Sequence, residues 1–180
     1  MNYLFYVIIG LLFIGLIWFI STHNKLKRTF IKIEEANSGI DVALTKRYDL
    51  LTQMVATVKG YKKNEKDTLL EVVKLRKNMT IDEKIIENNK MTKNIEKINV
   101  LVENYPELKA NENFKILQQS IVEVEEHLQA ARRMYNANVS IFNQMVVTIP
   151  SNIVASMLKM ERQTFFEAEE AKKDNVKIEF

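Results

Sequence analysis

The stretch that decides the fold runs from Glu112 to Pro150 and reads ENFKILQQSIVEVEEHLQAARRMYNANVSIFNQMVVTIP. Steps of three and four residues along it stay on one side of an α-helix, which turns every 3.6 residues. Ten of the eleven positions on this side suit a protein core, and the eleven are Phe114, Leu117, Ile121, Val124, Leu128, Ala131, Tyr135, Asn138, Phe142, Met145 and Ile149. The pattern predicts a long amphipathic helix that Pro150 ends, since proline lacks the N–H group that a helix interior needs.

A second stripe of this kind starts at Leu26 and runs to Met79, with twelve apolar residues at its sixteen positions. It predicts a first long helix over residues 25–78. Glu65 and Thr68 interrupt the stripe, so we expect a bend near Gly60 or Asn64.

Between these two helices the sequence predicts another, over residues 81–104. Thr80 and Glu83 have the spacing of a capping box, in which each side chain accepts a hydrogen bond from the other residue's backbone N–H. Pro106 should end this helix and open a loop from Pro106 to Glu112. Its expected inner face is Ile81, Ile85, Ile95, Ile98, Val102 and Tyr105.

Ser151 is a suitable N-cap for a shorter fourth helix. The apolar residues of this helix are Ile153, Val154, Met157 and Leu158, and the tail from Val176 to Phe180 should be an extended arm. Short connections between amphipathic helices favour antiparallel neighbours. We therefore expect an all-α protein, with an N-terminal transmembrane helix followed by an antiparallel up-and-down bundle of three long helices and a shorter fourth. The expected domains are an anchor over residues 1–22 and a bundle with an extended C-terminal tail over residues 23–180.

The anchor is the stretch Tyr3–Ile20, YLFYVIIGLLFIGLIWFI, which has no charged side chain. Its 18 residues make a helix about 27 Å long, close to the thickness of the hydrocarbon core of a bilayer. A cleaved signal peptide is the alternative, but it would need basic residues before the apolar run and small residues at a cleavage site. A buried core helix is a further alternative. The sequence favours one uncleaved span that contacts the lipid bilayer through residues 3–20.

The charges beside the span indicate its orientation. Lys25, Lys27 and Arg28 follow the span, and no basic side chain precedes it. Basic residues favour the cytoplasmic side, so we expect the N-terminus outside and the bundle in the cytoplasm. Long soluble domains can be exported despite such a short cluster.

The composition provides little for catalysis. The chain has 180 residues, no cysteine, two histidines, four glycines, two prolines and a net charge of +3. A di-iron bundle needs two Glu-x-x-His motifs, and here His127 follows Glu123 by four residues. The near-balanced charge is unlike that of proteins that bind nucleic acid. We expect no catalytic residue, no cofactor, no metal and no nucleic-acid partner.

Two sets of residues are candidates for a site. Polar residues on the apolar stripes, with Asp41 as a partner, predict a buried polar network made of Asn37, Asp41, Arg47 and Asn138. Apolar residues near the C-terminus either form an interaction surface or dock on their own bundle, and they are Phe165, Phe166, Val176, Ile178 and Phe180. The basic cluster Lys59, Lys62, Lys63 and Lys66 fits a solvated helix face, or else a surface for an acidic partner or anionic lipid.

Several blocks of the chain resemble the LemA family of bacterial membrane proteins. They are Ile40-Asp41-Val42, Lys46-Arg47-Tyr48-Asp49-Leu50, Thr57-Val58-Lys59-Gly60-Tyr61, Tyr105–Phe114, Ala131-Arg132 with Tyr135-Asn136, Pro150-Ser151-Asn152 and Phe165–Ala171. Asn37 stands where the family commonly has Trp, and Leu51-Thr52-Gln53 where it often has Ile-Pro-Asn. The resemblance implies a single-pass inner-membrane protein with a helical bundle and no established enzymatic activity, and it supplies no catalytic residues.

Two classes of function fit these observations. The first is a non-enzymatic scaffold or adaptor that binds protein partners, still unidentified, at the cell membrane. The second is a membrane-associated enzyme or enzyme subunit that uses carboxylates such as Glu125, Glu126, Glu169 and Glu170, or Arg132 and Arg133. A lipid-binding or envelope-binding module is a further alternative, and self-association through the first helix is compatible with each.

Overall fold

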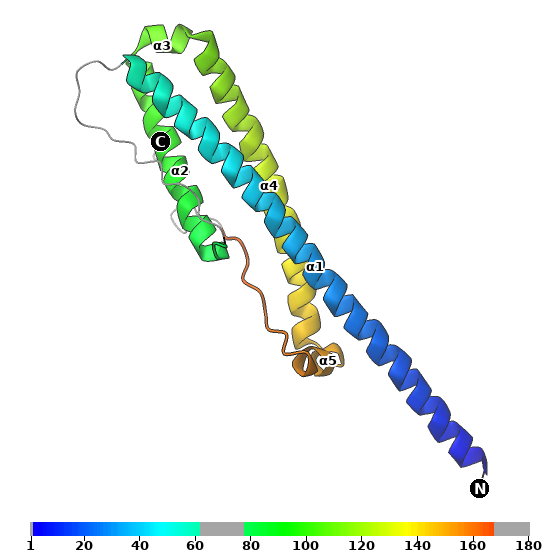
Figure 1. The fold of residues 1–180 in the computed structure, drawn as a ribbon. Helices are drawn as coiled ribbons and strands as arrows, with labels where there is room; N and C mark the ends of the chain where they lie inside the picture. The colour runs from blue at the N-terminus through cyan, green and yellow to red at the C-terminus, as the bar shows by residue number, and fades with distance from the viewer. Residues whose placement is uncertain (1, 62–77, 168–180) are drawn as a thin grey trace, which may run out of the picture. The chain divides into compact units, whose positions relative to one another are not determined.

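The computed structural model describes residues 2–61 and 78–167, and every regular element in these ranges is a helix (Figure 1). The helices are α1 (Asn2–Tyr61), α2 (Ile81–Glu103), α3 (Pro106–Ala110), α4 (Glu112–Val147) and α5 (Ser151–Met157). The predicted all-α fold with a long apolar N-terminal helix is confirmed.

Helix α1 is continuous over 60 residues. The apolar stretch and the stripe that starts at Leu26 therefore belong to one helix, which passes the predicted domain boundary after residue 22 without a break. That boundary stays a prediction. The bend was predicted near Gly60 or Asn64: α1 is helical through Gly60, and Asn64 falls on residues 62–77, outside the described residues, as does much of the basic cluster from Lys59 to Lys66. Residue 78, the predicted end of the first helix, is described and lies in a turn.

The chain divides into two compact units, and α1 and α4 each contribute to both. The N-terminal unit comprises Met1–Asn37 and Met134–Phe165, and the central unit comprises Ser38–Arg133 and Phe166–Phe180.

In the N-terminal unit, α1 and α4 pack against each other as antiparallel helices. The rings of Phe30 and Phe142 lie 5.7 Å apart, and the Asn138 side-chain amide donates a hydrogen bond of 3.1 Å to the carbonyl of Lys32. The core of this unit consists of Leu26, Ile33, Ala36, Tyr135, Val139, Phe142, Met145, Val154 and Ala155.

The end of α4 differs from the prediction. The helix stops at Val147, so Ile149 lies beyond it and is 83% exposed instead of buried. Ser151 does not cap α5, because it is the first residue of that helix. Its hydroxyl instead donates a shared hydrogen bond to the carbonyls of Met145, at 2.8 Å, and Thr148, at 3.0 Å, at the end of α4. Of the predicted apolar residues of α5, only Val154 is fully buried.

The segment after α5 is held against α4 by hydrogen bonds. The side-chain amide of Asn143 donates to the carbonyl of Gln163 and accepts from its backbone N–H, both at 2.8 Å. The Tyr135 hydroxyl donates to the carbonyl of Thr164 at 3.0 Å. Buried polar groups need such partners, and here an extended segment without its own secondary structure provides them.

The central unit packs α1, α2, α3 and α4 around one apolar cluster. Its buried members are Leu51, Met54, Val55, Val58, Met91, Ile98, Val102, Leu108, Phe114 and Ile121. The predicted loop from Pro106 to Glu112 is wrong, because residues 106–110 form the short helix α3. Proline at the first helical position loses no intrahelical bond, and Leu108 then anchors this turn in the core.

Helix α2 begins as predicted. The Glu83 backbone N–H donates to the Thr80 hydroxyl at 3.2 Å, and the Thr80 backbone N–H donates to the Glu83 carboxylate at 2.8 Å. The predicted inner face is only partly right, since Ile81, Ile85 and Ile95 are half-buried. The buried residues of α2 are Lys84, Asn88, Met91, Ile98 and Val102.

Candidate functional site

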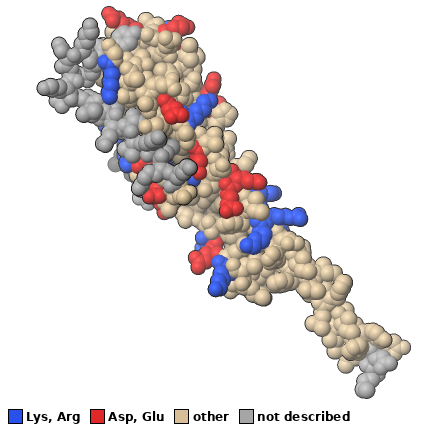
Figure 2. Space-filling view, in the orientation of Figure 1, with Lys and Arg blue, Asp and Glu red and all other residues tan. Residues whose placement is uncertain are grey.

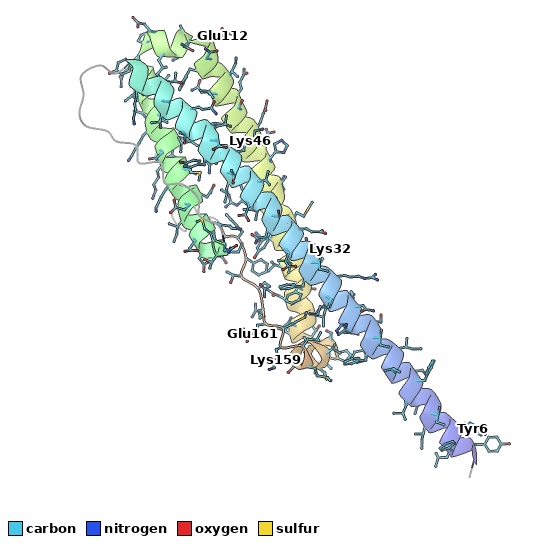
Figure 3. The ribbon with its side chains drawn as sticks, in the orientation of Figure 1. Tyr6, Lys32, Lys46, Glu112, Lys159 and Glu161 are labelled. Carbon is cyan, nitrogen blue, oxygen red and sulfur yellow. The ribbon has the colours of Figure 1, made fainter. Side chains whose placement is uncertain are left out.

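The first candidate feature is the apolar stretch of α1 from Tyr3 to Ile20. None of an 18-residue apolar window at this end of α1 is buried, and Figure 3 shows side chains around Tyr6 standing away from the helix on all sides. Acidic and basic side chains are interspersed on the bundle surface, whereas this end of α1 carries neither (Figure 2). Among the described residues, α1 is the one unbroken helix that is long enough and apolar enough to cross a membrane.

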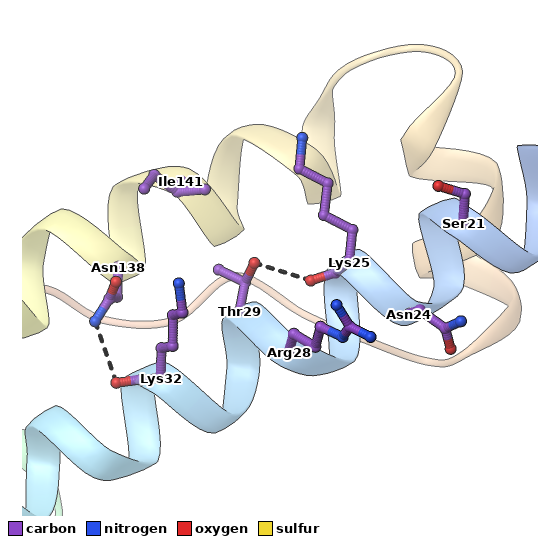
Figure 4. Close-up of a pocket in the computed structure, with 8 residues that line it drawn as sticks. All are labelled: Ser21, Asn24, Lys25, Arg28, Thr29, Lys32, Asn138 and Ile141. Carbon is purple, nitrogen blue, oxygen red and sulfur yellow. Dashed lines mark hydrogen bonds between the residues drawn. The ribbon is translucent and has the colours of Figure 1, made fainter.

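Directly after this stretch, α1 and α4 form an open pocket of about 690 Å³ (Figure 4). Three cationic residues of α1 line it at one-turn spacing, namely Lys25, Arg28 and Lys32, and none of its eight lining residues is acidic. The other lining residues are Ser21, Asn24, Thr29, Asn138 and Ile141.

The walls of this pocket are fixed by hydrogen bonds within the N-terminal unit. The Thr29 hydroxyl donates to the carbonyl of Lys25 at 2.9 Å, and Asn138 of α4 donates to the carbonyl of Lys32 (Figure 4). Lys25, Arg28 and Lys32 are exposed, so their charged ends are accessible to an anion.

The second candidate feature is a buried ionic network in the central unit. Arg47 of α1 is 4% exposed, and its guanidinium donates to the side-chain oxygen of Asn88, to the Asn88 carbonyl at 3.3 Å and to the Thr92 hydroxyl at 3.1 Å. It also forms an ion pair of 2.9 Å with the Glu125 carboxylate of α4. Lys84 of α2, four residues before Asn88, is also buried, and it forms an ion pair with Asp41 of α1. These contacts join α1, α2 and α4.

Two arginines share the Glu125 carboxylate. Burial lowers the pKa of Arg47, Glu125 opposes this effect, and the positive charge of Arg132 adds to the lowering. Burial also lowers the pKa of Arg132, again opposed by Glu125. Glu125 therefore acts as a counter-charge to both arginines.

Arg132 also holds the start of the C-terminal segment. Its guanidinium carbon lies 4.4 Å from the centre of the Phe166 ring, and its Nη2 donates to the carbonyl of Glu167 at 3.5 Å. Phe166 is 3% exposed and Phe165 is half-buried. The Phe166 ring therefore packs in the fold of the central unit and is not exposed to a partner. Of the candidate interaction surface, Val176, Ile178 and Phe180 lie outside the described residues.

The four residues of the predicted polar network fall in both units. Asn37 and Asn138 belong to the N-terminal unit, where Asn138 bonds to α1, and Asp41 and Arg47 belong to the central unit. Asp41 pairs with Lys84, whereas Arg47 contacts Asn88, Thr92 and Glu125. The contacts described for Asp41 and Arg47 are therefore with different partners.

The predicted inner face of residues 81–104 omits Lys84 and Asn88, because only apolar residues were followed along this helix. Continuing the stripe backward from Ile98 by three and four residues reaches Ile95, Met91, Asn88 and Lys84. That spacing was the available signal that both polar side chains face inward.

The acidic residues and histidines were also candidates for a metal site. Within residues 2–61 and 78–167, no three His, Asp or Glu side chains are close enough to hold a metal ion. His127 and Glu126 are exposed, and Glu169 and Glu170 lie outside the described residues.

The described residues define an all-helical protein with one long apolar N-terminal helix, and comparisons with known proteins show its family. A model of the LemA family matches residues 36–180. Protein LemA of Metamycoplasma hominis is 28% identical over 179 residues, covering 96% of this chain and 82% of that relative. The chain belongs to the LemA family, as the sequence blocks indicated.

Proposed function

We propose that this protein is a single-pass protein of the bacterial cell membrane, anchored by α1, whose helical bundle is a non-enzymatic scaffold for protein partners. The N-terminus is outside the cell and the bundle is in the cytoplasm. The observation that carries the proposal is the exposed apolar stretch of α1 from Tyr3 to Ile20, followed by Lys25, Lys27 and Arg28.

The energetics of this stretch support an anchor. It contains thirteen Leu, Ile, Phe or Val residues. Each contributes roughly 0.3–0.6 kcal/mol to membrane insertion near the centre of a span, so together they contribute at most about 4–8 kcal/mol. In water the same side chains would expose an apolar patch much larger than soluble proteins tolerate.

The central unit supports a scaffold. Its buried charges are used to join helices, as Arg47 does between α1, α2 and α4, so they stabilise one arrangement of the bundle. A bundle fixed in this way presents a constant surface to a partner. The predicted docking segment is the C-terminal tail with Val176, Ile178 and Phe180, which follows the anchoring contact of Phe166 with Arg132.

The anchor is tested by extracting membranes with alkaline carbonate. The variant Leu11→Arg/Leu12→Arg places two charges at the middle of the stretch, each costing about 2.5–3.5 kcal/mol of insertion free energy. We expect the unaltered chain to stay in the membrane pellet at full mass and the double Arg variant to be released. The control Leu11→Ile/Leu12→Ile should behave as the unaltered chain. Release of the unaltered chain, or its recovery without residues 1–20, would refute the anchor.

The scaffold is tested with a chain that ends at Glu167, which keeps the contacts of Gln163 and Phe166. Partners are identified by cross-linking in cells and then compared between the full and shortened chains. We expect the shortened chain to lose specific cross-links while its melting temperature stays within about 2 °C, the shift that corresponds to roughly 0.5 kcal/mol. Equal cross-linking of both chains would contradict the assignment of docking to the tail.

A further inference from the structure

We propose that the N-terminal unit binds the phosphate-bearing headgroups of anionic phospholipids in the pocket lined by Lys25, Arg28 and Lys32. This inference rests on the proposed function, because it requires α1 to be inserted in a bilayer. The pocket lies at the point where the helix leaves the apolar stretch.

The first argument is depth. Lys25, Arg28 and Lys32 follow Ile20 by five, eight and twelve residues, which places them about 8, 12 and 18 Å further along the helix axis. The headgroup layer of a bilayer is about 5–8 Å thick on each side. Side chains of a helix tilt toward its N-terminus, here toward the bilayer, and long basic side chains can reach back to the interface. Lys25 and Arg28 can therefore contact headgroups, and Lys32 lies within about one Debye length of the layer.

The second argument is charge. From Ser21 to Ile33 the chain carries basic residues and no acidic one, whereas acids and bases alternate elsewhere on the bundle. Each basic residue close to an anionic membrane surface strengthens binding by about fivefold. Ser21 and Asn24 add a hydroxyl and an amide to the pocket wall, and both are suitable donors to phosphate oxygens.

The third argument is the register of α1 and α4. Phe30 contacts Phe142, and Lys32 contacts Asn138, so the antiparallel helices run level with each other. Continuing this register by about 1.5 Å per residue brings the end of α4 level with about residue 24 of α1, just past the apolar stretch. The turn from α4 to α5 thus lies at the depth of the pocket.

That turn and helix α5 expose apolar side chains. Ile149 is 83% exposed, Ile153 57% and Met157 67%, and α5 is bent by 94° from α4. Because α4 is antiparallel to α1, α5 lies across the direction of the anchor, as an interfacial helix lies along a membrane surface. Apolar groups beside a basic pocket fit the boundary between headgroups and acyl chains, and they do not fit a site for a free anion.

The experiment measures which lipids the full chain retains in zwitterionic detergent. The purified protein is equilibrated with mixed micelles that hold equal phosphatidylglycerol and phosphatidylcholine, and bound lipids are quantified by mass spectrometry. We expect phosphatidylglycerol to be strongly enriched. The variant Lys25→Gln/Arg28→Gln/Lys32→Gln should bind phosphatidylglycerol on the order of 100-fold more weakly, because each lost basic residue weakens binding by about fivefold. The enrichment should then disappear.

A matched control removes three exposed charges elsewhere, with Lys46→Gln/Lys97→Gln/Lys115→Gln, and should keep the enrichment. The variant Lys25→Arg/Lys32→Arg keeps the charges of the pocket and should keep it too. Equal loss of enrichment in the control and pocket variants would overturn the proposal, because net charge alone would then explain the effect.

Two further outcomes separate this proposal from the anchor. If excess inorganic phosphate displaces the bound phosphatidylglycerol, the pocket takes free phosphate and the lipid proposal is overturned. If the unaltered chain resists carbonate extraction but shows no lipid preference, the headgroup proposal fails while the anchor stands. If the pocket variant resists carbonate extraction but has lost the lipid preference, both the anchor and the headgroup proposal are supported.

Discussion

Replacing Glu125 with glutamine removes the counter-charge of a buried arginine while keeping the size of the side chain. Arg47 is 4% exposed and lies 2.9 Å from the Glu125 carboxylate, so it cannot recover its hydration without unfolding. Glutamine can still accept one hydrogen bond, but the charge of Arg47 is then uncompensated. Arg132, which also interacts with Glu125, would repel it.

The size of the effect follows from charge separation and exposure. Two unit charges about 4 Å apart near a protein surface attract by about 4 kcal/mol. The Glu125 side chain is 33% exposed, so solvent screens this attraction. Part of the attraction is also offset by the cost of removing the Glu125 carboxylate from water. The expected loss of unfolding free energy is therefore about 1–3 kcal/mol. For a chain of this size that loss lowers the melting temperature by about 2–4 °C per kcal/mol.

The assay is urea unfolding of the full chain in detergent, followed by circular dichroism. Glu126→Gln is the matched control, since Glu126 is exposed and should change the free energy of unfolding by less than about 0.5 kcal/mol. A double-mutant cycle with Arg47→Met should give a coupling energy of about 1–2 kcal/mol. A Glu125→Gln variant as stable as the control, or a cycle without coupling, would refute the reasoning.

Three other predictions concern the same unit. Phe166→Ala should lower the free energy of unfolding by about 3 kcal/mol, because it empties a buried site under Arg132, and urea unfolding measures this loss. Gly39→Ala should raise the melting temperature, since a Cβ there would lie 3.8 Å from the Cβ of Ala131 and alanine favours a helix by about 1 kcal/mol over glycine. The pKa of Arg47 is lowered in the folded state, so its burial costs stability below that pKa, and stability is regained only as pH rises from the folded toward the unfolded pKa. The stability of the unaltered chain relative to Arg47→Met should accordingly not fall as the pH is raised above neutral, and a relative loss of stability at alkaline pH in urea unfolding curves would contradict this.

The helices themselves were largely predictable from the sequence. The start of α2 followed from the capping residues Thr80 and Glu83, and most of α4 followed from its apolar stripe. Its end did not, because Ile149 continues the apolar pattern although the backbone has already left the helix. The sequence predicts a loop that opens at Pro106, but proline is equally suited to the first turn of a helix, and only the burial of Leu108 decides between the two.

The site residues were less predictable, because their positions depend on partners in other helices. Arg47 was visible as a polar residue on an apolar stripe, but its partners Asn88 and Glu125 lie 41 and 78 residues away in the chain. The pocket could not be foreseen either. Its cations are local to α1, but its second wall is Asn138 and Ile141 of α4, and only the antiparallel register brings them there.

The central claim is that one span holds the bundle in the cytoplasm, and the chain has no native cysteine, so site-specific labelling tests it most directly. Single cysteines at Asn2 and at Gln119, which is exposed on α4, are treated in intact cells with a membrane-impermeant maleimide. We predict labelling at position 2 alone, with position 119 labelled only after the cells are opened. Labelling of position 119 in intact cells would contradict the account and place the bundle outside the membrane.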